Sequence, residues 1–128
     1  MSRHVLDELF DDTVFERLKS QHIAIDKIGA GFGNTGWSDE KILQALQSSG
    51  KTFHTRDHGF YRLSCLHPSY CIVCYDVPLG EMTLYIRRFL RHPLFNTHAK
   101  RLGKVVKITT QRIEFWQRRH STKTIVRW

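Results

Sequence analysis

The chain has 128 residues, 41% of them hydrophobic, which suits one compact domain spanning residues 1–128. No apolar stretch approaches the roughly 18 residues of a membrane-spanning helix, and residues 1–20 lack the basic start and apolar run of a signal peptide, so we expect a soluble, cytoplasmic protein with no membrane partner. Lys and Arg outnumber Asp and Glu by 20 to 12, giving a net charge of +8 that favours a polyanionic partner such as RNA.

The first third of the chain predicts strand, helix and strand in succession. Residues 3–6 form a short apolar run that ends in Asp7, so we expect a buried strand whose carboxyl end carries an acid. A helix then follows, capped by an acid or threonine at positions 11–13. Alternating isoleucines at residues 23–28 predict a second strand, which stops at the glycine-rich loop at residues 29–36.

The alternation continues through the middle of the chain. Ser38 and Gly50 predict the start and the end of a helix, and residues 52–55 predict a strand that ends near Asp57. Next we expect a short helix at residues 59–66 and an apolar strand at residues 70–75. An amphipathic helix should follow at residues 81–91, with Leu84, Phe89 and Leu90 facing inward.

This order of elements predicts an α/β fold. Strands that alternate with helices favour parallel strands joined by right-handed crossovers, hence a three-layer sandwich around a central, mostly parallel sheet. Residues 104–108 and 112–116 are β-rich runs separated by a short link, which predicts a C-terminal β-hairpin at the sheet edge. No repeat or linker interrupts the chain, so a single domain is expected.

Three acids are expected at one end of this sheet. Ligands of open parallel sheets bind beyond the carboxyl ends of the strands, where Asp7 and Asp57 fall. Asp39, one residue after the Ser38 cap, opens a helix at the same end. Three crowded carboxylates raise one another's pKa unless a cation offsets their charge, and Mg²⁺ or Mn²⁺ prefers such oxygen ligands. Taken singly, Asp39 also fits a helix-dipole role and Asp57 a turn.

Four segments also resemble a known family. The strings VLDE at residues 5–8, GWSDEKIL at 36–43, TRDHGF at 55–60 and KVVKITTQRIEF at 104–115 are similar, in order and spacing, to motifs of the compact PIN-like proteins related to VapC toxins. The resemblance implies a PIN-like fold and a Mg²⁺- or Mn²⁺-dependent RNA endonuclease. It further implies the toxin role in a toxin–antitoxin pair, with an antitoxin protein as partner. A homodimer is a further possible assembly.

Carried over by motif, the resemblance assigns Asp7, Asp39 and Asp57 as catalytic and metal-binding acids. PIN nucleases of ordinary length have a further acid that has no clear place here, for which Glu8, Glu40 and Asp26 are candidates. Compact relatives also often carry an acid where this chain has Gly59. A reduced set of acids keeps open an alternative: a weak or inactive PIN-like protein that binds RNA or a partner.

Basic and aromatic residues complete the expected site. Thr55 would orient a ligand or phosphate, Arg56 and His58 would contact phosphate, and Trp37 would stack on an unpaired base. Tyr61 is a further stacking candidate, whereas Phe60 is better explained as a core residue. From position 87 onward bases predominate and should flank the acids with positive charge: Arg87, Arg88, Arg91, Lys100, Arg101, Lys104, Lys107, Arg112, Arg118, Arg119, Lys123 and Arg127.

Two other motifs offer rival readings. Gly31, Gly33 and Gly36 fit a G-x-G-x-x-G nucleotide-binding pattern, although Asp39 and Glu40 would put negative charge where a pyrophosphate should bind. Cys71 and Cys74 form a C-x-x-C within a predicted strand. Residues three apart on a strand face opposite ways, so we expect both cysteines, and Cys65, to be buried thiols without a shared metal.

Overall fold

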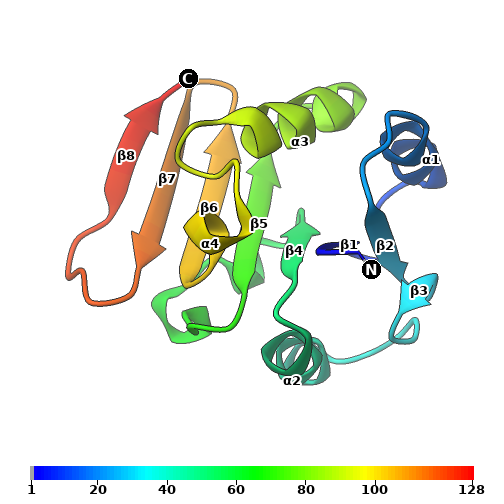
Figure 1. Ribbon diagram of the computed structural model, residues 1–128, viewed down its shortest axis with the longest axis horizontal. Helices are drawn as coiled ribbons and strands as arrows, with labels where there is room; N and C mark the ends of the chain where they lie inside the picture. The colour runs from blue at the N-terminus through cyan, green and yellow to red at the C-terminus, as the bar shows by residue number, and fades with distance from the viewer. Residues whose placement is uncertain (1) are drawn as a thin grey trace.

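The computed structural model describes residues 2–128 as an eight-stranded sheet with helices on both faces (Figure 1). The strands are β1 (His4–Leu6), β2 (Ile25–Ile28), β3 (Gly31–Phe32), β4 (Thr52–Thr55), β5 (Cys71–Asp76), β6 (Lys104–Thr109), β7 (Arg112–Gln117) and β8 (Thr124–Arg127). The α-helices are α1 (Asp12–Ser20), α2 (Asp39–Ser49), α3 (Met82–Arg91) and α4 (His98–Arg101). Three short 3-10 turns are η1 (His58–Phe60), η2 (Leu63–Cys65) and η3 (Leu79–Glu81).

The sheet is parallel through six strands and antiparallel at its C-terminal edge. Its order is β3-β2-β1-β4-β5-β6-β7-β8, with β1 and β4 side by side near the middle. The strands from β3 to β6 pair in parallel, whereas β7 and β8 run antiparallel to their neighbours. The expected α/β class and C-terminal hairpin are therefore confirmed, and β8 extends that hairpin by one strand.

Two hydrophobic cores fill the two faces of the sheet. On one face, Leu18 of α1 and Ile86 and Phe89 of α3 pack on a cluster that includes strand residues of β5, β6 and β7. On the other, Ile42 and Leu46 of α2 pack on a second cluster. Figure 1 shows α2 and α3 on opposite sides of the sheet. The sheet is thus covered on both faces, as alternating strands and helices require.

The helix ends follow the signals in the sequence. Asp11 caps α1 by accepting from the Thr13 N–H at 2.9 Å, and Ser38 caps α2 by accepting from the Lys41 N–H at 3.2 Å. Gly50 ends α2 in the left-handed region, with φ 70°, a conformation that glycine adopts without a Cβ clash. This capping fixes the start of α2 at Asp39, directly after the Ser38 cap.

Several expectations about the elements are wrong in detail. Residues 59–66 form two 3-10 turns instead of one helix, and Ile23 lies outside β2. Leu84 is 48% exposed, because α3 turns Tyr85, Ile86 and Phe89 toward the core instead. The apolar residues of α3 are compatible with either of two buried helix faces. In the structure the buried face is the one that contains Tyr85 and Ile86, so Leu84 points toward solvent.

The cysteines behave as expected from strand geometry. All three are free and buried, and Cys71 and Cys74 belong to the two different cores. Burial raises the pKa of the Cys71 and Cys74 thiols to about 12. Both thiols therefore stay protonated and act as small core side chains.

Candidate functional site: an acid pocket at the ends of β1 and β4

The site is built where two neighbouring parallel strands end together. Asp7 directly follows β1, and its backbone N–H donates to the His54 carbonyl of β4 at 2.9 Å. Thr55 is the last residue of β4 and is fully buried. The Thr55 hydroxyl donates to Asp7 Oδ2 at 2.6 Å and accepts from the Asp57 N–H at 2.9 Å. One buried hydroxyl thus ties both predicted acids to the same strand end.

Asp7 is an acid held in an unfavourable place for its charge. Asp7 is only 7% exposed, and burial raises the pKa of its carboxyl above the ordinary value. The Thr55 hydroxyl and the backbone N–H groups of Glu8 and Leu9 act in the opposite direction and favour the ionised form. Burial therefore disfavours the charged form of Asp7 while the hydrogen bonds favour it, and a cation in the pocket would stabilise the carboxylate further.

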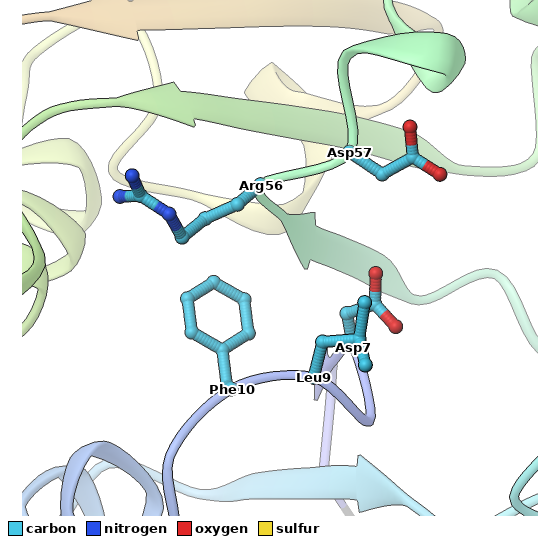
Figure 2. A pocket seen from close by; sticks show the side chains of 5 residues that line it. All are labelled: Asp7, Leu9, Phe10, Arg56 and Asp57. Carbon is cyan, nitrogen blue, oxygen red and sulfur yellow. The ribbon is translucent and has the colours of Figure 1, made fainter.

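A pocket of about 280 Å³ opens beside Asp7. Its lining, which defines the acid pocket, is Asp7, Leu9, Phe10, Arg56 and Asp57 (Figure 2). The Asp57 side chain is exposed, and its Oδ1 caps the turn η1 by accepting from the Gly59 N–H at 2.8 Å. In Figure 2 the two carboxylates lie on one side of the pocket and the Arg56 guanidinium on the other.

The Arg56 guanidinium forms hydrogen bonds within the fold. Its Nη1 donates to the Val77 carbonyl at 2.7 Å and to Met82 Sδ at 3.2 Å. These contacts connect the end of β4 to the start of α3. The expected phosphate contact by Arg56 would therefore have to come from the part of the guanidinium that remains open to the pocket.

Asp39 stands apart from this pair. It opens α2, where its partly exposed carboxylate favours the helix N-terminus, and it does not line the acid pocket. Its charge is felt by Cys65, whose pKa is raised mainly by burial. Among residues 2–128, no three His, Cys, Asp or Glu side chains come together as a metal-holding group. The expected meeting of Asp7, Asp39 and Asp57 around one point is therefore not seen in this part of the chain.

Glu8 has a different partner from the one expected. Both of its carboxylate oxygens accept from the Gly36 N–H at 3.1 Å, which fastens the glycine-rich loop to the end of β1. Glu40 is exposed, and Asp26 lies 3.9 Å from Lys51 Nζ. None of the three candidate substitute acids lines the acid pocket.

Side chains of the protein itself occupy the space beside the glycines of the glycine-rich loop. A Cβ on Gly31 would lie 2.6 Å from Asp26 Oδ1, and a Cβ on Gly33 would lie 2.5 Å from the Trp37 ring. The Gly36 N–H is already used by Glu8. The glycines are thus needed for close packing, and this arrangement argues against a phosphate cradle.

The remaining predicted contact residues differ in their exposure and their neighbours. His58 is exposed in η1, whereas Phe60 is 1% exposed and packs edge-on against Phe53, which confirms its core role. Trp37 is partly buried beside Phe32, with Lys41 Nζ 5.5 Å from its ring centre. Tyr61 packs on Trp116 of β7, a neighbour that its position in the sequence did not suggest.

A buried polar chain beneath the site was missed by sequence reasoning. His4 Nδ1 lies 3.1 Å from His54 Nε2, and His54 Nδ1 lies 2.7 Å from the Tyr75 hydroxyl. Burial lowers the pKa of His4 to about 3 and that of His54 well below its ordinary value. The available signal was positional: His4 and His54 lie on adjacent strands, and Tyr75 lies on the next one.

The bases of the second half have mixed roles. Arg101 is buried and donates to the Phe95 carbonyl at 2.9 Å, and Arg88 stacks on Trp128 with 4.3 Å to the ring centre. Others, including Arg112, Arg118, Arg119, Lys123 and Arg127, are exposed. Exposed positive charge therefore lies on β7, β8 and the loop between them, and also at Arg91 of α3 and Lys100 of α4.

The donor set of the acid pocket fits a hard divalent cation. Mg²⁺ commonly uses one or two protein carboxylates and completes its shell with water and substrate phosphates. Asp7 and Asp57 provide two carboxylates, one of them buried and prepared by hydrogen bonds. A site that relies on more protein ligands than these two would not fit the residues present.

Comparison of the chain with family models, with characterised proteins and with solved structures finds no match. Among the described residues 2–128, no helix is long and apolar enough to cross a membrane. The geometry of the acid pocket therefore carries the functional argument.

Proposed function

We propose that this chain is a Mg²⁺- or Mn²⁺-dependent endoribonuclease with a PIN-like sheet, whose metal is held by Asp7 and Asp57. The observation that supports it most is the buried Asp7 carboxylate, oriented by Thr55 at the shared end of β1 and β4 and facing a pocket with a second carboxylate. A buried acid with a purely structural role would be expected to form an ion pair with a basic side chain. Among the described residues, Asp7 has no ion pair with Lys, Arg or His.

The roles follow from these contacts. Asp7 is the anchoring carboxylate, Thr55 fixes its orientation, and Asp57 supplies the second, exposed carboxylate. When bound, the metal supplies a water of lowered pKa for attack on a phosphodiester and offsets the charge of the transition state. Asp39, at the same end of the sheet, would act on the substrate or its metal from outside the pocket.

The role of a toxin restrained by an antitoxin is part of the same proposal. A second pocket of about 550 Å³ adjoins the acid pocket and shares Leu9, Phe10 and Arg56 with it. Leu9 and Leu79 on its lips are 85% and 72% exposed. Exposed leucines beside a site are the kind of surface that a partner protein covers.

The test is a cleavage assay on an unstructured, labelled RNA with metal-stripped protein. Cleavage should appear with Mg²⁺ or Mn²⁺, disappear with EDTA, and be lost in Asp7→Asn. A second candidate function, RNA binding without catalysis, is favoured by the separation of Asp39 from the pocket. Metal-independent RNA binding with no cleavage under any of these conditions would support that alternative.

A further inference from the structure

The C-terminal strands expose one face of the sheet that no helix of residues 2–128 covers. On β7, Ile113 and Phe115 enter the core beneath α3, so the alternating residues Arg112, Glu114 and Trp116 face the other way. Neither β7 nor β8 contributes a buried residue to the core beneath α2. In Figure 1, β8 lies at the end of the sheet farthest from α1. Ile125, paired with Glu114, is 56% exposed on this open face.

Two aromatic rings lie together on the open face. The rings of Tyr61 and Trp116 are 4.9 Å apart and tilted by 30°, and both side chains are only partly buried. The Tyr61 hydroxyl donates to Glu114 Oε1 at 3.1 Å, which fixes its ring beside Trp116. The result is a supported aromatic pair, one ring from the loop after the acid pocket and the other from β7.

Cations surround this pair. Lys123 Nζ lies 4.6 Å from the Trp116 ring centre and 5.3 Å from that of Tyr61, and Lys107 Nζ lies 5.8 Å from that of Tyr61. Glu114, nearly buried, bonds to Arg112 and Lys123 at 2.9 and 3.3 Å. Burial would raise the pKa of Glu114, but the hydrogen bonds from Tyr61 and Lys123 lower it, so this carboxylate stays ionised. It holds the Arg112 and Lys123 side chains in place and offsets only one of the positive charges of this surface.

We define the stacking platform as Lys107, Arg112, Trp116, Lys123 and Tyr61. Part of the platform is in register with the acid pocket across the sheet, whereas Trp116 pairs with Val105 and lies two residues further along β7. Thr55 pairs with Cys74, Cys74 with Lys107, and Lys107 with Glu114, one strand after another on the same face. At about 4.8 Å per strand, this row leads from Thr55 to Lys107 of the platform in two steps, and a third step reaches Glu114 on β7.

We propose that the platform binds single-stranded RNA, with Trp116 and Tyr61 stacking on unpaired bases and the cations holding the flanking phosphates. Sequence-tolerant binding of single strands combines aromatic stacking with a basic track, and both are present here. Four bases, Lys107, Arg112, Lys123 and Arg127, face one acid, Glu114, which makes a polyanion the complementary occupant. The inference extends the proposed nuclease by giving it a substrate class and a binding surface outside the pocket.

The experiment measures binding of a fluorescein-labelled ten-nucleotide oligouridylate in EDTA, by anisotropy, so that no cleavage is needed. Trp116→Leu should weaken binding about 5- to 100-fold, the range for losing one stacked base. Trp116→Phe keeps a ring and should bind within about threefold of wild type. In wild type the oligonucleotide should quench tryptophan fluorescence, and Trp116→Phe should lose most of that quenching.

Arg88 provides the matched control for Lys123, because it also lies over a tyrosine and a tryptophan ring, but on the opposite face of the sheet. Arg88 lies 5.1 and 4.3 Å from the ring centres of Tyr85 and Trp128, much as Lys123 lies over Tyr61 and Trp116. Lys123→Ala should weaken RNA binding and lower the slope of log affinity against log salt by about one, whereas Arg88→Ala should change neither. Circular dichroism and melting curves would establish that each variant is folded.

Several outcomes would overturn the proposal. Equal binding by wild type and Trp116→Leu would do so, as would equal affinity for a duplex of the same length, because charge alone would then explain binding. A wild-type dimer that Trp116→Leu dissociates, without RNA binding, would instead assign the face to a second copy of the chain. If Trp116→Leu loses RNA binding but neither wild type nor any variant cleaves RNA, the platform proposal holds and the nuclease proposal fails. If wild type cleaves RNA and Trp116→Leu cleaves it equally well, the nuclease proposal holds and the platform proposal fails.

Discussion

The Thr55 hydroxyl donates to Asp7 Oδ2 at 2.6 Å, and this bond joins the ends of two neighbouring parallel strands. Both side chains are nearly inaccessible to solvent. A hydroxyl in this place favours the charged form of an acid that burial disfavours. The relationship therefore links the fold of the sheet to the readiness of Asp7 to meet a cation.

Replacing Thr55 tests that link, and the same strand offers its control. Thr55→Val removes the donor to Asp7 and should lower the free energy of unfolding by about 1–2 kcal/mol while raising the pKa of Asp7 further. Thr52 is equally buried, but among residues 2–128 its hydroxyl has no hydrogen-bond partner. Thr52→Val should thus be neutral or stabilising. Urea melts of the two variants check this, and equal losses of stability would contradict it.

Asp7→Asn should stabilise the metal-free protein. Burial raises the pKa of Asp7, so its ionisation at neutral pH opposes folding, and a neutral side chain of the same shape removes that cost. We expect the melting temperature in EDTA to rise by about 2–5 °C. Excess Mg²⁺ should raise the melting temperature of wild type but not of Asp7→Asn, and a metal-induced rise in both would argue against Asp7 as a ligand.

Asp57→Asn should lose cleavage while remaining folded. Asp57 is exposed, and an asparagine can still accept the Gly59 N–H, so little stability should change in EDTA. The gain expected for Asp7→Asn should be much smaller here, since exposed charges are well screened. A gel assay beside melting curves provides the measurement. Wild-type cleavage by this variant would reduce Asp57 to a turn residue.

Stability should fall as the pH drops below about 6.5, the ordinary pKa of histidine. His4 has its pKa lowered to about 3 in the folded protein, and that of His54 is also lowered, so the unfolded chain binds protons that the folded one does not. Each such histidine costs up to about 1.4 kcal/mol per pH unit between its two pKa values. The raised pKa of Asp7 opposes this trend only as the pH falls from that raised pKa toward the ordinary value of 3.8.

Urea melts at about pH 7.5 and 5.0 measure that loss. The exposed His58 supplies a control, because His58→Asn should leave the pH dependence unchanged. His4→Asn should flatten it. A stability that is constant between these two pH values would show that the buried histidines titrate normally.

The strand ends were the most predictable part of the site. An acid directly after a short apolar run gave Asp7, and the alternation of strands and helices indicated that its neighbour Thr55 would end a parallel strand. Ser38 and Gly50 fixed the limits of α2 through local capping, which needs no tertiary information. These features depend on residues a few positions apart, and so a single sequence carries them.

The features that sequence reasoning missed depend on pairing between distant strands. The contact of Tyr61 with Trp116 requires the register of β5, β6 and β7, and the His4–His54–Tyr75 chain requires the order of β1, β4 and β5. The position of Asp39 shows the same limit. Its place at the start of α2 was predictable, but its distance from Asp7 depends on how the loop before it is folded.

The most direct test of the nuclease proposal is the rate of RNA cleavage under single-turnover conditions as Mn²⁺ is added to metal-stripped protein. Asp76 is a suitable control acid, since it ends β5 at the same carboxyl end of the parallel strands and is exposed outside the acid pocket. The account predicts a metal-dependent rate for wild type and Asp76→Asn that falls at least about 100-fold in Asp7→Asn. A metal-independent rate, or equal rates for Asp7→Asn and Asp76→Asn, would contradict it.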